Sequence, residues 1–321
     1  IVEAIKLTMD QIKGAYSLVI LTDEELVAVR DPHGFRPLLL GKRDDGEYIF
    51  ASENCEIDIL GGEVIRDVEP GEIIVAKDGK LKSYFYSENY KPVKKSCIFE
   101  HIYFARNDAT IDKVNAYEFR VESGKILSQG DDVKADMVVP VPDSGWAGAI
   151  GYANASGLPL TEALVKNRYV GRTFITPSQE IRERAVAVKL NPLKANVKNR
   201  RVILIDDSIV RGTTSKRIVR HLKDAGATEV HVRIASPAIK FPCFYGVDTS
   251  TIEELISNKM NVEELCKYIE ADSLAFISEE GLKKSIHFSK EHTCGLCMSC
   301  FNGNYVTNLY DSFDKANKFE K

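Results

Sequence analysis

Short hydrophobic runs separated by polar turns divide the first part of the chain into predicted elements. Apolar residues recur at helical spacing over residues 2–12, which predicts a helix. Two apolar runs within residues 15–29 are separated by an acidic turn and predict a β-hairpin. Residues 1–93 are therefore predicted to form an α+β domain rich in strands. Further strands are predicted at residues 38–40, 48–51 and 72–76.

The pattern changes after the polar, proline-containing segment 91–95, which we take as a domain boundary. Beyond it, continuous apolar runs alternate with segments of helical periodicity. Such runs are typical of strands buried on both faces of a parallel sheet. We divide the chain into residues 1–93, residues 94–285 and a cysteine-rich segment 286–321. The predicted strands are residues 137–141, 202–205 and 230–235, and the predicted helices are residues 114–129, 147–153, 215–225, 252–255 and 262–269.

Composition and charge restrict the classes of function. The chain has 321 residues, of which 44% are hydrophobic and 28% charged, as is typical of a globular protein with a large core. The net charge of −4 argues against nucleic acid as a partner. No apolar run is long enough to span a bilayer and no signal peptide is recognisable, so we expect a cytoplasmic protein without a membrane partner. The chain starts at Ile1 without methionine, which suggests a processed or truncated protein.

Two aspartates follow the most apolar predicted strand. Residues 202–205 lead into Asp206 and Asp207, at the carboxyl end where open α/β sheets bind their ligands. Carboxylates at this place hold vicinal sugar hydroxyls or bind Mg²⁺. The backbone N–H groups of residues 211–214, two threonine hydroxyls and the N-terminus of the next helix form a cradle for phosphate, which Gly212 lets the backbone approach. A diol beside a phosphate is the chemistry of a ribose 5-phosphate.

Two other interpretations of this stretch remain. A Walker B strand also ends in acidic residues, but a P-loop of the form G-x-x-x-x-G-K-[ST] should then lie upstream, and the sequence contains none. An ordinary strand end with solvated aspartates gives the same local pattern.

A second anion site is predicted where residues 137–141 end. The turn Pro142-Asp143-Ser144-Gly145 lies between this strand and a helix of small residues. A turn before a helix N-terminus is a common anion site, and a serine hydroxyl suits a hard cation such as Mg²⁺.

Residues 166–184 carry five cations against two acids, with glycine and proline among them. A solvated loop is one interpretation of this composition. The other is a mobile hood that closes over pyrophosphate and excludes water.

The chain has seven cysteines, three of them near its end, which indicates metal or cluster binding in a reducing compartment rather than a disulfide scaffold. Cys294, Cys297 and Cys300 form two successive C-x-x-C steps. Zinc and an iron–sulfur cluster both fit this spacing. Cys55 and Cys266 are expected to be packed core thiols.

Together these motifs resemble the amidophosphoribosyltransferases. Residues 202–214 are similar to the signature with which type I phosphoribosyltransferases bind phosphoribosyl pyrophosphate (PRPP), and residues 166–174 to the family's flexible loop. Residues 29–38, 50–53 and 67–72 resemble the family's glutaminase domain, an N-terminal-nucleophile amidohydrolase. The resemblance implies an α/β type I phosphoribosyltransferase fold, a parallel sheet flanked by helices, preceded by a partial α+β glutaminase domain.

The resemblance also implies roles for residues of the transferase domain. Catalysis is assigned to Lys166, Arg172, Asp206 and Asp207, with the two cations on pyrophosphate. The implied Mg²⁺ ligands are Ser144, Asp206 and Asp207. The implied PRPP-binding residues are Asp143, Ser144, Lys166, Arg172, Asp206, Asp207, Ser208, Val210, Arg211, Gly212, Thr213 and Thr214.

One branch of the family carries a [4Fe–4S] cluster, and the resemblance is to this branch. In the family, the cysteine that corresponds to Cys300 is not a cluster ligand. Such a cluster pins three distant segments together, so its implied role is structural rather than electron transfer. The implied ligands are Cys97, Cys243, Cys294 and Cys297.

The glutaminase resemblance is incomplete. Ile1 has no nucleophilic side chain, whereas the family uses an N-terminal cysteine whose α-amino group is the base. Asp58 matches the aspartate that binds the amino group of glutamine, but it is only a fragment of that site. We therefore expect the chain to use ammonia but not glutamine.

The implied reaction forms 5-phosphoribosylamine and pyrophosphate from PRPP and glutamine-derived ammonia, the first committed step of purine biosynthesis. The family implies purine nucleotides as feedback inhibitors, and a homotetramer if the truncation permits it. One alternative is a salvage phosphoribosyltransferase that joins a free base to PRPP, against which the glutaminase remnant and the matched cysteines argue. The other is a non-catalytic PRPP-sensing regulator, which should carry a DNA-binding domain and a basic face.

Overall fold

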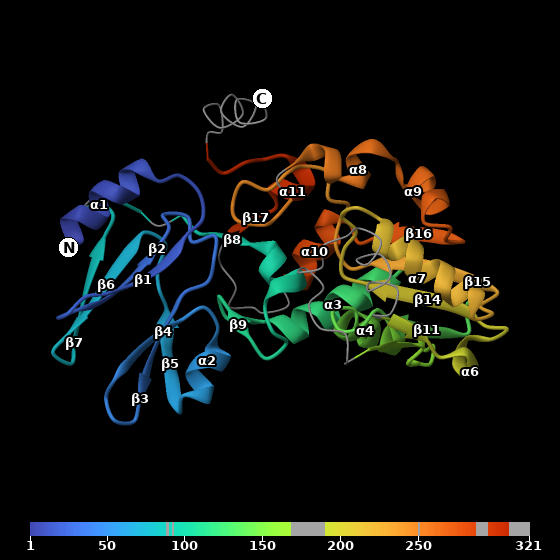
Figure 1. Ribbon diagram of the computed structural model, residues 1–321, viewed down its shortest axis with the longest axis horizontal. Coiled ribbons are helices and arrows are strands. Elements are labelled where there is room, and N and C mark those ends of the chain that lie inside the picture. Colours follow the sequence, from blue (N-terminus) through green and yellow to red (C-terminus); the bar gives the residue numbers. More distant parts are fainter. Residues whose placement is uncertain (88–89, 92, 168–189, 250, 287–294, 308–321) are drawn as a thin grey trace, which may run out of the picture. The chain divides into compact units, whose positions relative to one another are not determined.

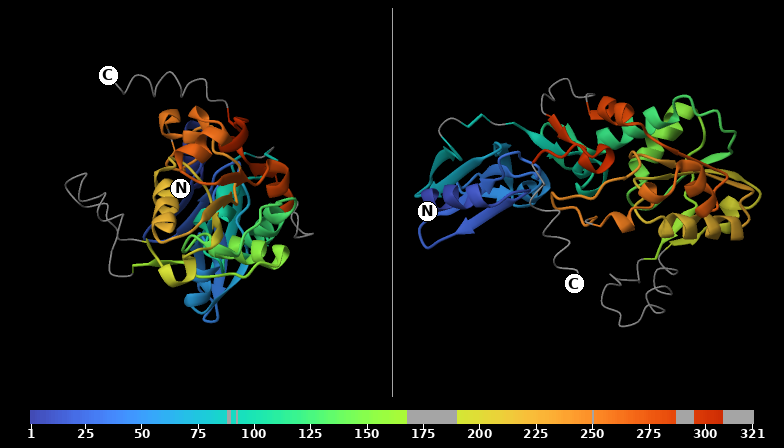
Figure 2. Two further views of the ribbon diagram at one scale, coloured as in Figure 1. Left: turned by 90° about the vertical axis from the view of Figure 1, so that its right-hand side faces the viewer. Right: turned by 90° about the horizontal axis from the view of Figure 1, so that it is seen from above.

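The computed structural model describes residues 1–321 with the exception of residues 88–89, 92, 168–189, 250, 287–294 and 308–321. The chain divides into two compact units, each assembled from segments that are distant in the sequence (Figure 1, Figure 2). Unit 1 comprises residues 1–116, 241–250 and 289–321, and unit 2 comprises residues 117–240 and 251–288.

The two compact units have different boundaries from the three segments that the sequence predicts. Residues 94–116 belong to unit 1, where the backbone N–H of Cys97 donates to the carbonyl of Phe35 (2.9 Å). A segment around Cys243 joins the same unit, because the N–H of Phe241 donates to the carbonyl of Cys300 (3.1 Å). Contacts between distant segments therefore hold unit 1 together, and the predicted division into three segments stays a prediction.

Residues 1–85 of unit 1 form two antiparallel sheets and two helices that lie against them. The first sheet has the strand order β1-β2-β6-β7 and the second β4-β3-β5. The predicted N-terminal helix, hairpin and later strands are confirmed. The bounds are α1 Val2–Gln11, β1 Ser17–Leu21, β2 Leu26–Arg30, β3 Leu39–Arg43, β4 Tyr48–Ala51, α2 Asn54–Ile59, β5 Gly62–Asp67, β6 Glu72–Lys77 and β7 Lys80–Phe85.

Alternating side chains on β2 explain the layers of unit 1. Val27 and Val29 pack in one hydrophobic cluster with Ile5 of α1. Ala28, which points to the opposite face, packs in another cluster with Leu40 of the second sheet. Because successive side chains of a strand face opposite ways, β2 is covered by a helix on one face and by a sheet on the other.

The remaining elements of unit 1 carry three of its cysteines, Cys97, Cys297 and Cys300. β8 pairs in parallel with β17, although the two strands lie far apart in the sequence. A π-helical turn (η1) follows β8, a short helix (α11) follows β17, and β9 pairs with β10. The bounds are β8 Lys95–Cys97, η1 Glu100–Phe104, β9 Thr110–Ile111, β10 Val114–Asn115, β17 Gly295–Cys297 and α11 Ser299–Asn302.

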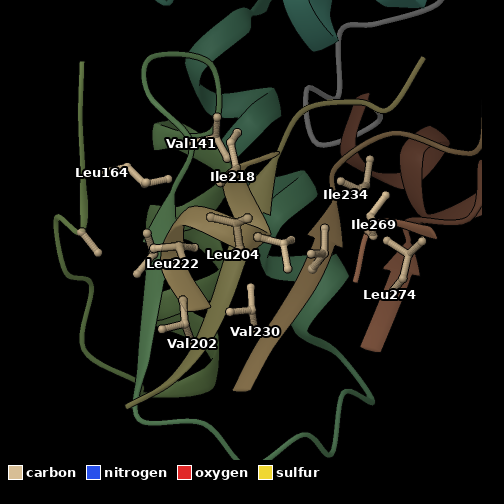
Figure 3. Close-up of a cluster of buried hydrophobic side chains, with 14 of the residues drawn as sticks. Val141, Leu164, Val202, Leu204, Ile218, Leu222, Val230, Ile234, Ile269 and Leu274 are labelled. Atoms are coloured by element: carbon tan, nitrogen blue, oxygen red, sulfur yellow. The ribbon is translucent and has the colours of Figure 1, made fainter. Parts of the chain in front are cut away.

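Unit 2 is built on a parallel sheet with the strand order β11-β14-β15-β16 (Figure 1). Apolar side chains of α7 and α9 pack with the strands in one core, which Figure 3 shows. The predicted parallel sheet flanked by helices is thus confirmed. The bounds are α3 Ala116–Ser128, β11 Met137–Pro140, α4 Trp146–Ser156, β14 Arg201–Asp206, α7 Thr213–Asp224, β15 Glu229–Ile234, α9 Val262–Tyr268 and β16 Ser273–Phe276.

Glycines bring α3 and α4 into direct backbone contact. A Cβ on Gly124 would lie 1.8 Å from the carbonyl oxygen of Gly148, and a Cβ on Gly151 would lie 1.8 Å from that of Val121. Only residues without a side chain allow this approach. The small residues that follow the predicted Ser144 turn therefore serve helix packing.

The predicted helix over residues 252–255 is wrong. A single 3₁₀ turn (η3, Ile252–Glu254) is followed by fully buried Leu255 in extended backbone, and then by α8 (Ile256–Lys259). The N–H of Ile256 donates to the carbonyl of Val210 (2.9 Å). The chain leaves the helical path because this bond ties it to the loop that follows β14.

Among the described residues of the chain, no helix combines the length and apolarity needed to cross a membrane. The other elements of unit 2 are short. The bounds are β12 Leu164–Lys166, β13 Leu190–Pro192, α6 Lys194–Val197 and α10 Glu279–Ile286.

A buried ion pair secures the face of the sheet opposite to the core of Figure 3. The guanidinium of Arg233 on β15 bonds Asp131 through Nε and, at 2.9 Å, through Nη2, and only 3% of the Arg233 side chain is exposed. The Tyr152 hydroxyl of α4 donates to the same carboxylate (2.6 Å). Burial raises the pKa of Asp131, but the bonds from Arg233 and Tyr152 outweigh it, so the pKa is lowered overall.

We expect the substitution Asp131→Asn to destabilise unit 2 by about 3 kcal/mol at pH 7, because it leaves the Arg233 cation buried without its counter-charge. A lowered pKa in the folded state gives stability that is present above about pH 4 and is lost as the pH falls through the folded pKa. The difference from wild type should therefore shrink in acid. Trp146, the single tryptophan of the chain, reports urea unfolding of this unit.

The matched control is Asp132→Asn, which removes an exposed carboxylate from the adjacent position. It should change the free energy of unfolding little at any pH. Equal losses in the two variants would contradict the role given to the buried pair.

Candidate active site

Two aspartates end β14 at the carboxyl edge of the unit 2 sheet. Asp206 is the last residue of the strand, and Asp207 follows it with 7% of its surface exposed. The backbone N–H of Asp207 donates to Asp206 Oδ1 (2.9 Å), which fixes the first carboxylate against the second residue. Both residues therefore lie where parallel sheets bind ligands.

Burial and mutual repulsion make this acid pair costly to ionise. Burial raises the pKa of Asp206 well above its ordinary value, and the charge of Asp207 adds to the shift. Burial also raises the pKa of Asp207, although hydrogen bonds from Ser144 and Ser208 and the charge of Arg120 oppose the change. A divalent cation would relieve the repulsion, and these hard oxygen donors fit Mg²⁺, which binds one or two carboxylates and completes its shell with water and substrate phosphates.

The loop after the acid pair leads into the N-terminus of α7. Gly212 is the N-cap with φ 72°, and the exposed residues Thr213 and Thr214 begin the helix. The first N–H groups of a helix lack intrahelical acceptors and attract anions. The positive φ favours glycine, and a Cβ on Gly212 would lie 3.2 Å from Ile256 Cδ1, so an added side chain would press on Ile256. The residues predicted to bind phosphate therefore lie at a helix N-terminus, and their role stays a prediction.

Other residues of this loop have less direct positions. The Arg211 side chain forms an ion pair with Glu254, and more than half of it is exposed. Val210 contributes its carbonyl to the N–H of Ile256 (2.9 Å). The Ser208 hydroxyl donates to Asp207 Oδ1, so this side chain supports the acid pair.

The turn between β11 and α4 lies beside the end of β14. The N–H of Val141 donates to the carbonyl of Ile205 (2.9 Å), and a Cβ on Gly145 would lie 2.4 Å from the same oxygen. This close packing brings the Ser144 hydroxyl to Asp207, to which it is hydrogen-bonded. The structure thus brings together Ser144 and the acid pair, which the sequence predicts as Mg²⁺ ligands.

One predicted cation lies at this turn and the other lies outside the described residues. Lys166, the last residue of β12, forms an ion pair with exposed Asp143. Arg172, with most of the predicted hood over residues 166–184, falls within the undescribed range 168–189. Lys166 is therefore placed next to the second predicted anion site.

Arg120 is a site residue that the sequence does not reveal. It lies on α3 with 9% of its surface exposed, and its charge acts on Asp207. In the sequence it stands between Glu118 and Glu122, which is the ordinary pattern of a solvated helix face. Only the packing of α3 shows that this cation belongs to the acid pair.

The cysteines of unit 1 form a second candidate site. β8 and β17 are paired so that Cys97 lies opposite Cys297. The charges of Cys97, Cys243 and Cys297 all act on Cys300, whose pKa is raised well above its ordinary value by burial first and then by these neighbours. Four thiols from three distant segments therefore gather in one region.

This set differs from the predicted cluster ligands in one member. Cys300 lies with the other cysteines, whereas Cys294 lies outside the described residues. In the described part of the chain, the only three ligand atoms close enough to share one ion belong to Glu53, Cys55 and Glu56, and the two glutamates also form the capping box of α2. The four gathered thiols thus do not close around a single ion. Thiolates of a [4Fe–4S] cluster each bind a different iron, so wider spacing suits that group.

Asp58 lies on α2 of unit 1, where it is exposed and accepts a hydrogen bond from Asn54 Nδ2 (3.1 Å). It lines a cavity of about 1060 Å³ together with β5 and the segments 93–95 and 110–113. Its predicted role toward glutamine stays a prediction. Cys55, buried beside Glu53, and Cys266, packed against the unit 2 core, are core thiols as predicted.

Family comparison agrees with the geometry of both units. The phosphoribosyl transferase domain matches residues 120–238, and the glutamine amidotransferase domain matches residues 2–58. The parallel sheet, the acid pair and the phosphate cradle of unit 2 therefore define a type I phosphoribosyltransferase domain.

Comparison over nearly all of the given chain identifies the family. The amidophosphoribosyltransferases of Bacillus subtilis and Archaeoglobus fulgidus are each 48% identical to this chain over 96% of it, which corresponds to 64% and 67% of their own lengths. The solved glutamine PRPP amidotransferase of B. subtilis, complexed with ADP and GMP, superposes with a TM-score of 0.88 at 48% identity, over 97% of this chain and 68% of that one. The chain belongs to the amidophosphoribosyltransferase family. It spans about two thirds of the length of these relatives.

We expect Gly212→Ala to weaken binding of ribose 5-phosphate about tenfold, a change of about 1.4 kcal/mol. The added Cβ contacts Ile256 and Tyr268, and the left-handed backbone disfavours alanine, so the N–H groups of the cradle shift. Isothermal titration calorimetry measures the affinity.

Gly157→Ala is the matched control. Gly157 has φ 73° at the end of α4, and a Cβ there meets nothing within 4 Å. This variant carries the same backbone cost of about 1 kcal/mol but should bind as wild type does. Equal affinities in the two variants would refute the cradle.

Proposed function

We propose that unit 2 catalyses the displacement of pyrophosphate from C1 of PRPP by ammonia, which gives 5-phosphoribosylamine. The observation that carries this proposal is the juxtaposition, in one unit, of the acid pair Asp206 and Asp207, the α7 cradle and the Ser144 turn. The C1–N bond forms as the C1–O bond breaks. Pyrophosphate leaves with the electron pair, and the bound nitrogen releases one proton to solvent.

The cradle and the acid pair divide the work of positioning. The N–H groups at residues 211–214 bind the 5-phosphate, because the N-terminus of α7 favours anions. Asp206 and Asp207 accept hydrogen bonds from the ribose hydroxyls or from water on the metal. Since the carboxylates and the cradle lie on one short loop, the ribose ring is held with C1 directed toward the Ser144 turn.

The leaving group requires positive charge. Lys166 lies beside the turn and Arg172 follows it in the sequence, and both neutralise the charge that grows on pyrophosphate as the bond breaks. When bound through Ser144, Asp206 and Asp207, Mg²⁺ supplies further charge stabilisation to the pyrophosphate oxygens. Arg120 stabilises ionised Asp207 from behind the site.

Purine nucleotides are the regulatory ligands that we propose for this site. The B. subtilis relative is described as complexed with ADP and GMP. A nucleotide 5-phosphate and its ribose present the same groups as the product, so the α7 cradle suits them. The homotetramer and the cytoplasmic location stay predictions.

We expect ammonium ions to support pyrophosphate release from PRPP and Mg²⁺, and Asp207→Asn to lower the rate about a hundredfold, since it removes a charge aimed at the ribose and the metal. A coupled assay for pyrophosphate measures the rate. Asp132→Asn, an exposed acid outside the site, serves as the control and should leave the rate unchanged.

The choice of nitrogen donor separates the alternatives. Turnover with glutamine would contradict the predicted restriction to ammonia. Release driven by adenine or guanine but not by ammonium would favour a salvage transferase. PRPP binding without release in any mixture would favour a regulator.

We also infer that unit 1 holds a [4Fe–4S] cluster on Cys97, Cys243, Cys297 and Cys300. The gathering of these four thiols supports the inference, and it replaces Cys294 of the resemblance by Cys300. The cluster would join β8, the segment around Cys243 and β17, so its role is to hold unit 1 together.

Protein purified without oxygen should contain iron and acid-labile sulfide, and Cys300→Ser should lose both, whereas Cys294→Ser should keep them. Cys266→Ser, in the unit 2 core, is the control for a thiol outside the site. If Cys300→Ser keeps iron and sulfide and Cys294→Ser loses them, the fourth ligand is Cys294, as the resemblance implies. Zinc without sulfide would show a different metal.

A further inference from the structure

One arginine of the N-terminal part of unit 1 touches two of the cysteine-bearing segments. Arg36, in the loop between β2 and β3, forms an ion pair with Glu100 through Nη1. Its Nη2 donates to the carbonyl of Gly246 (2.7 Å), and its guanidinium lies 5.0 Å from the centre of the Phe104 ring. We propose that Arg36 is a positioning residue of the cysteine centre, that is, of Cys97, Cys243, Cys297 and Cys300. Arg36 ties the cysteine-bearing segments together and supplies positive charge to their thiolates.

The bridge is specific because of where its two acceptors lie. Glu100 lies three residues after Cys97, and Gly246 lies three residues after Cys243. A single planar guanidinium therefore fixes the spacing of two cysteines from distant parts of the sequence. Lysine does not reproduce this bridge, because its ammonium lacks the rigid fork of donors.

The loop that carries Arg36 is itself held rigidly against β8. The carbonyl of Phe35 accepts a hydrogen bond from the N–H of Cys97 (2.9 Å). The ring of Phe35 stacks on the ring of Tyr245, with 4.1 Å between the ring centroids. Fully buried Arg30 donates to the carbonyl of Arg36 (2.8 Å). The segment that resembles a glutaminase signature thus works in this chain as a support for the cysteine centre.

The charge of Arg36 acts on two of the thiols from a largely buried position, and at Cys97 it opposes the charge of Glu100. Only 19% of the Arg36 side chain is exposed, and its charge acts on both Cys97 and Cys243. A cation beside thiolate ligands stabilises the more negative, reduced form of a cluster and so raises its reduction potential. Arg36 is thereby expected to affect both the retention and the potential of the group.

This inference rests on the proposed cluster, so the experiment separates the two. Holoprotein purified without oxygen is analysed for iron, for midpoint potential and for the rate at which air bleaches the cluster absorption. Arg36→Gln should lower the potential and bleach about tenfold faster, the usual scale for loss of a supporting contact around a metal. Arg36→Lys should restore the potential, because charge remains, but not the slow bleaching.

Arg43→Gln is the control, since it removes an arginine whose ion pairs with Asp45 and Glu47 lie on the surface of β3. A potential and a bleaching rate in Arg36→Gln equal to those of the control would overturn the inference. Iron-free wild-type protein would instead overturn the cluster.

Amide hydrogen exchange tests whether Arg36 connects the Glu100 and Gly246 segments, even in iron-free protein. Amides of residues 97–100 and 243–246 should exchange faster in Arg36→Gln than in Arg43→Gln, because the tie between the two segments is lost. Equal exchange in the two variants would show that Arg36 positions neither segment.

Discussion

The parallel pairing of β11 with β14 is the interaction on which the candidate active site depends. Its register sets Pro140 beside Ile205, and the bond from the N–H of Val141 to the Ile205 carbonyl continues it into the turn. Gly145 then approaches the same oxygen so closely that any side chain is excluded. Ser144 reaches Asp207 because of this register, and a slip of one residue would turn the strand's side chains to the other face.

Local sequence patterns were sufficient for most elements and for the acid pair. Four apolar residues followed by Asp206 and Asp207 indicate both the buried strand and its ligand-binding end, since hydrophobic burial and strand polarity act within a few residues. The same holds for Gly212, whose φ is required by the turn that precedes α7. Elements decided by distant contacts were predicted less well: residues 252–255 leave the helix because Ile256 bonds to Val210.

The features that sequence reasoning missed depend on packing between distant segments. Arg120 has the local pattern of a surface cation, and only the glycine contacts of α3 with α4 bring it toward Asp207. The repeated C-x-x-C spacing permits either Cys294 or Cys300 as a ligand, because each lies three residues from Cys297. The parallel pairing of β17 with β8 and the bond between Phe241 and Cys300 place Cys300 near Cys97 and Cys243, whereas Cys294 lies outside the described residues and stays a prediction.

Both candidate sites bury groups of like charge, and this explains why each draws an arginine from another element. Two carboxylates near one another in unit 2 cannot both ionise cheaply, and Arg120 offsets only part of the repulsion, so the pKa of each stays raised. Four thiols in unit 1 face the same difficulty, and Arg36 offsets part of it. Among the described residues, the neighbouring arginine at each place offsets only part of the cost of ionisation. A cation bound at the acid pair, or the proposed iron cluster at the thiols, would relieve this cost, so the unfavourable electrostatics would contribute to its affinity.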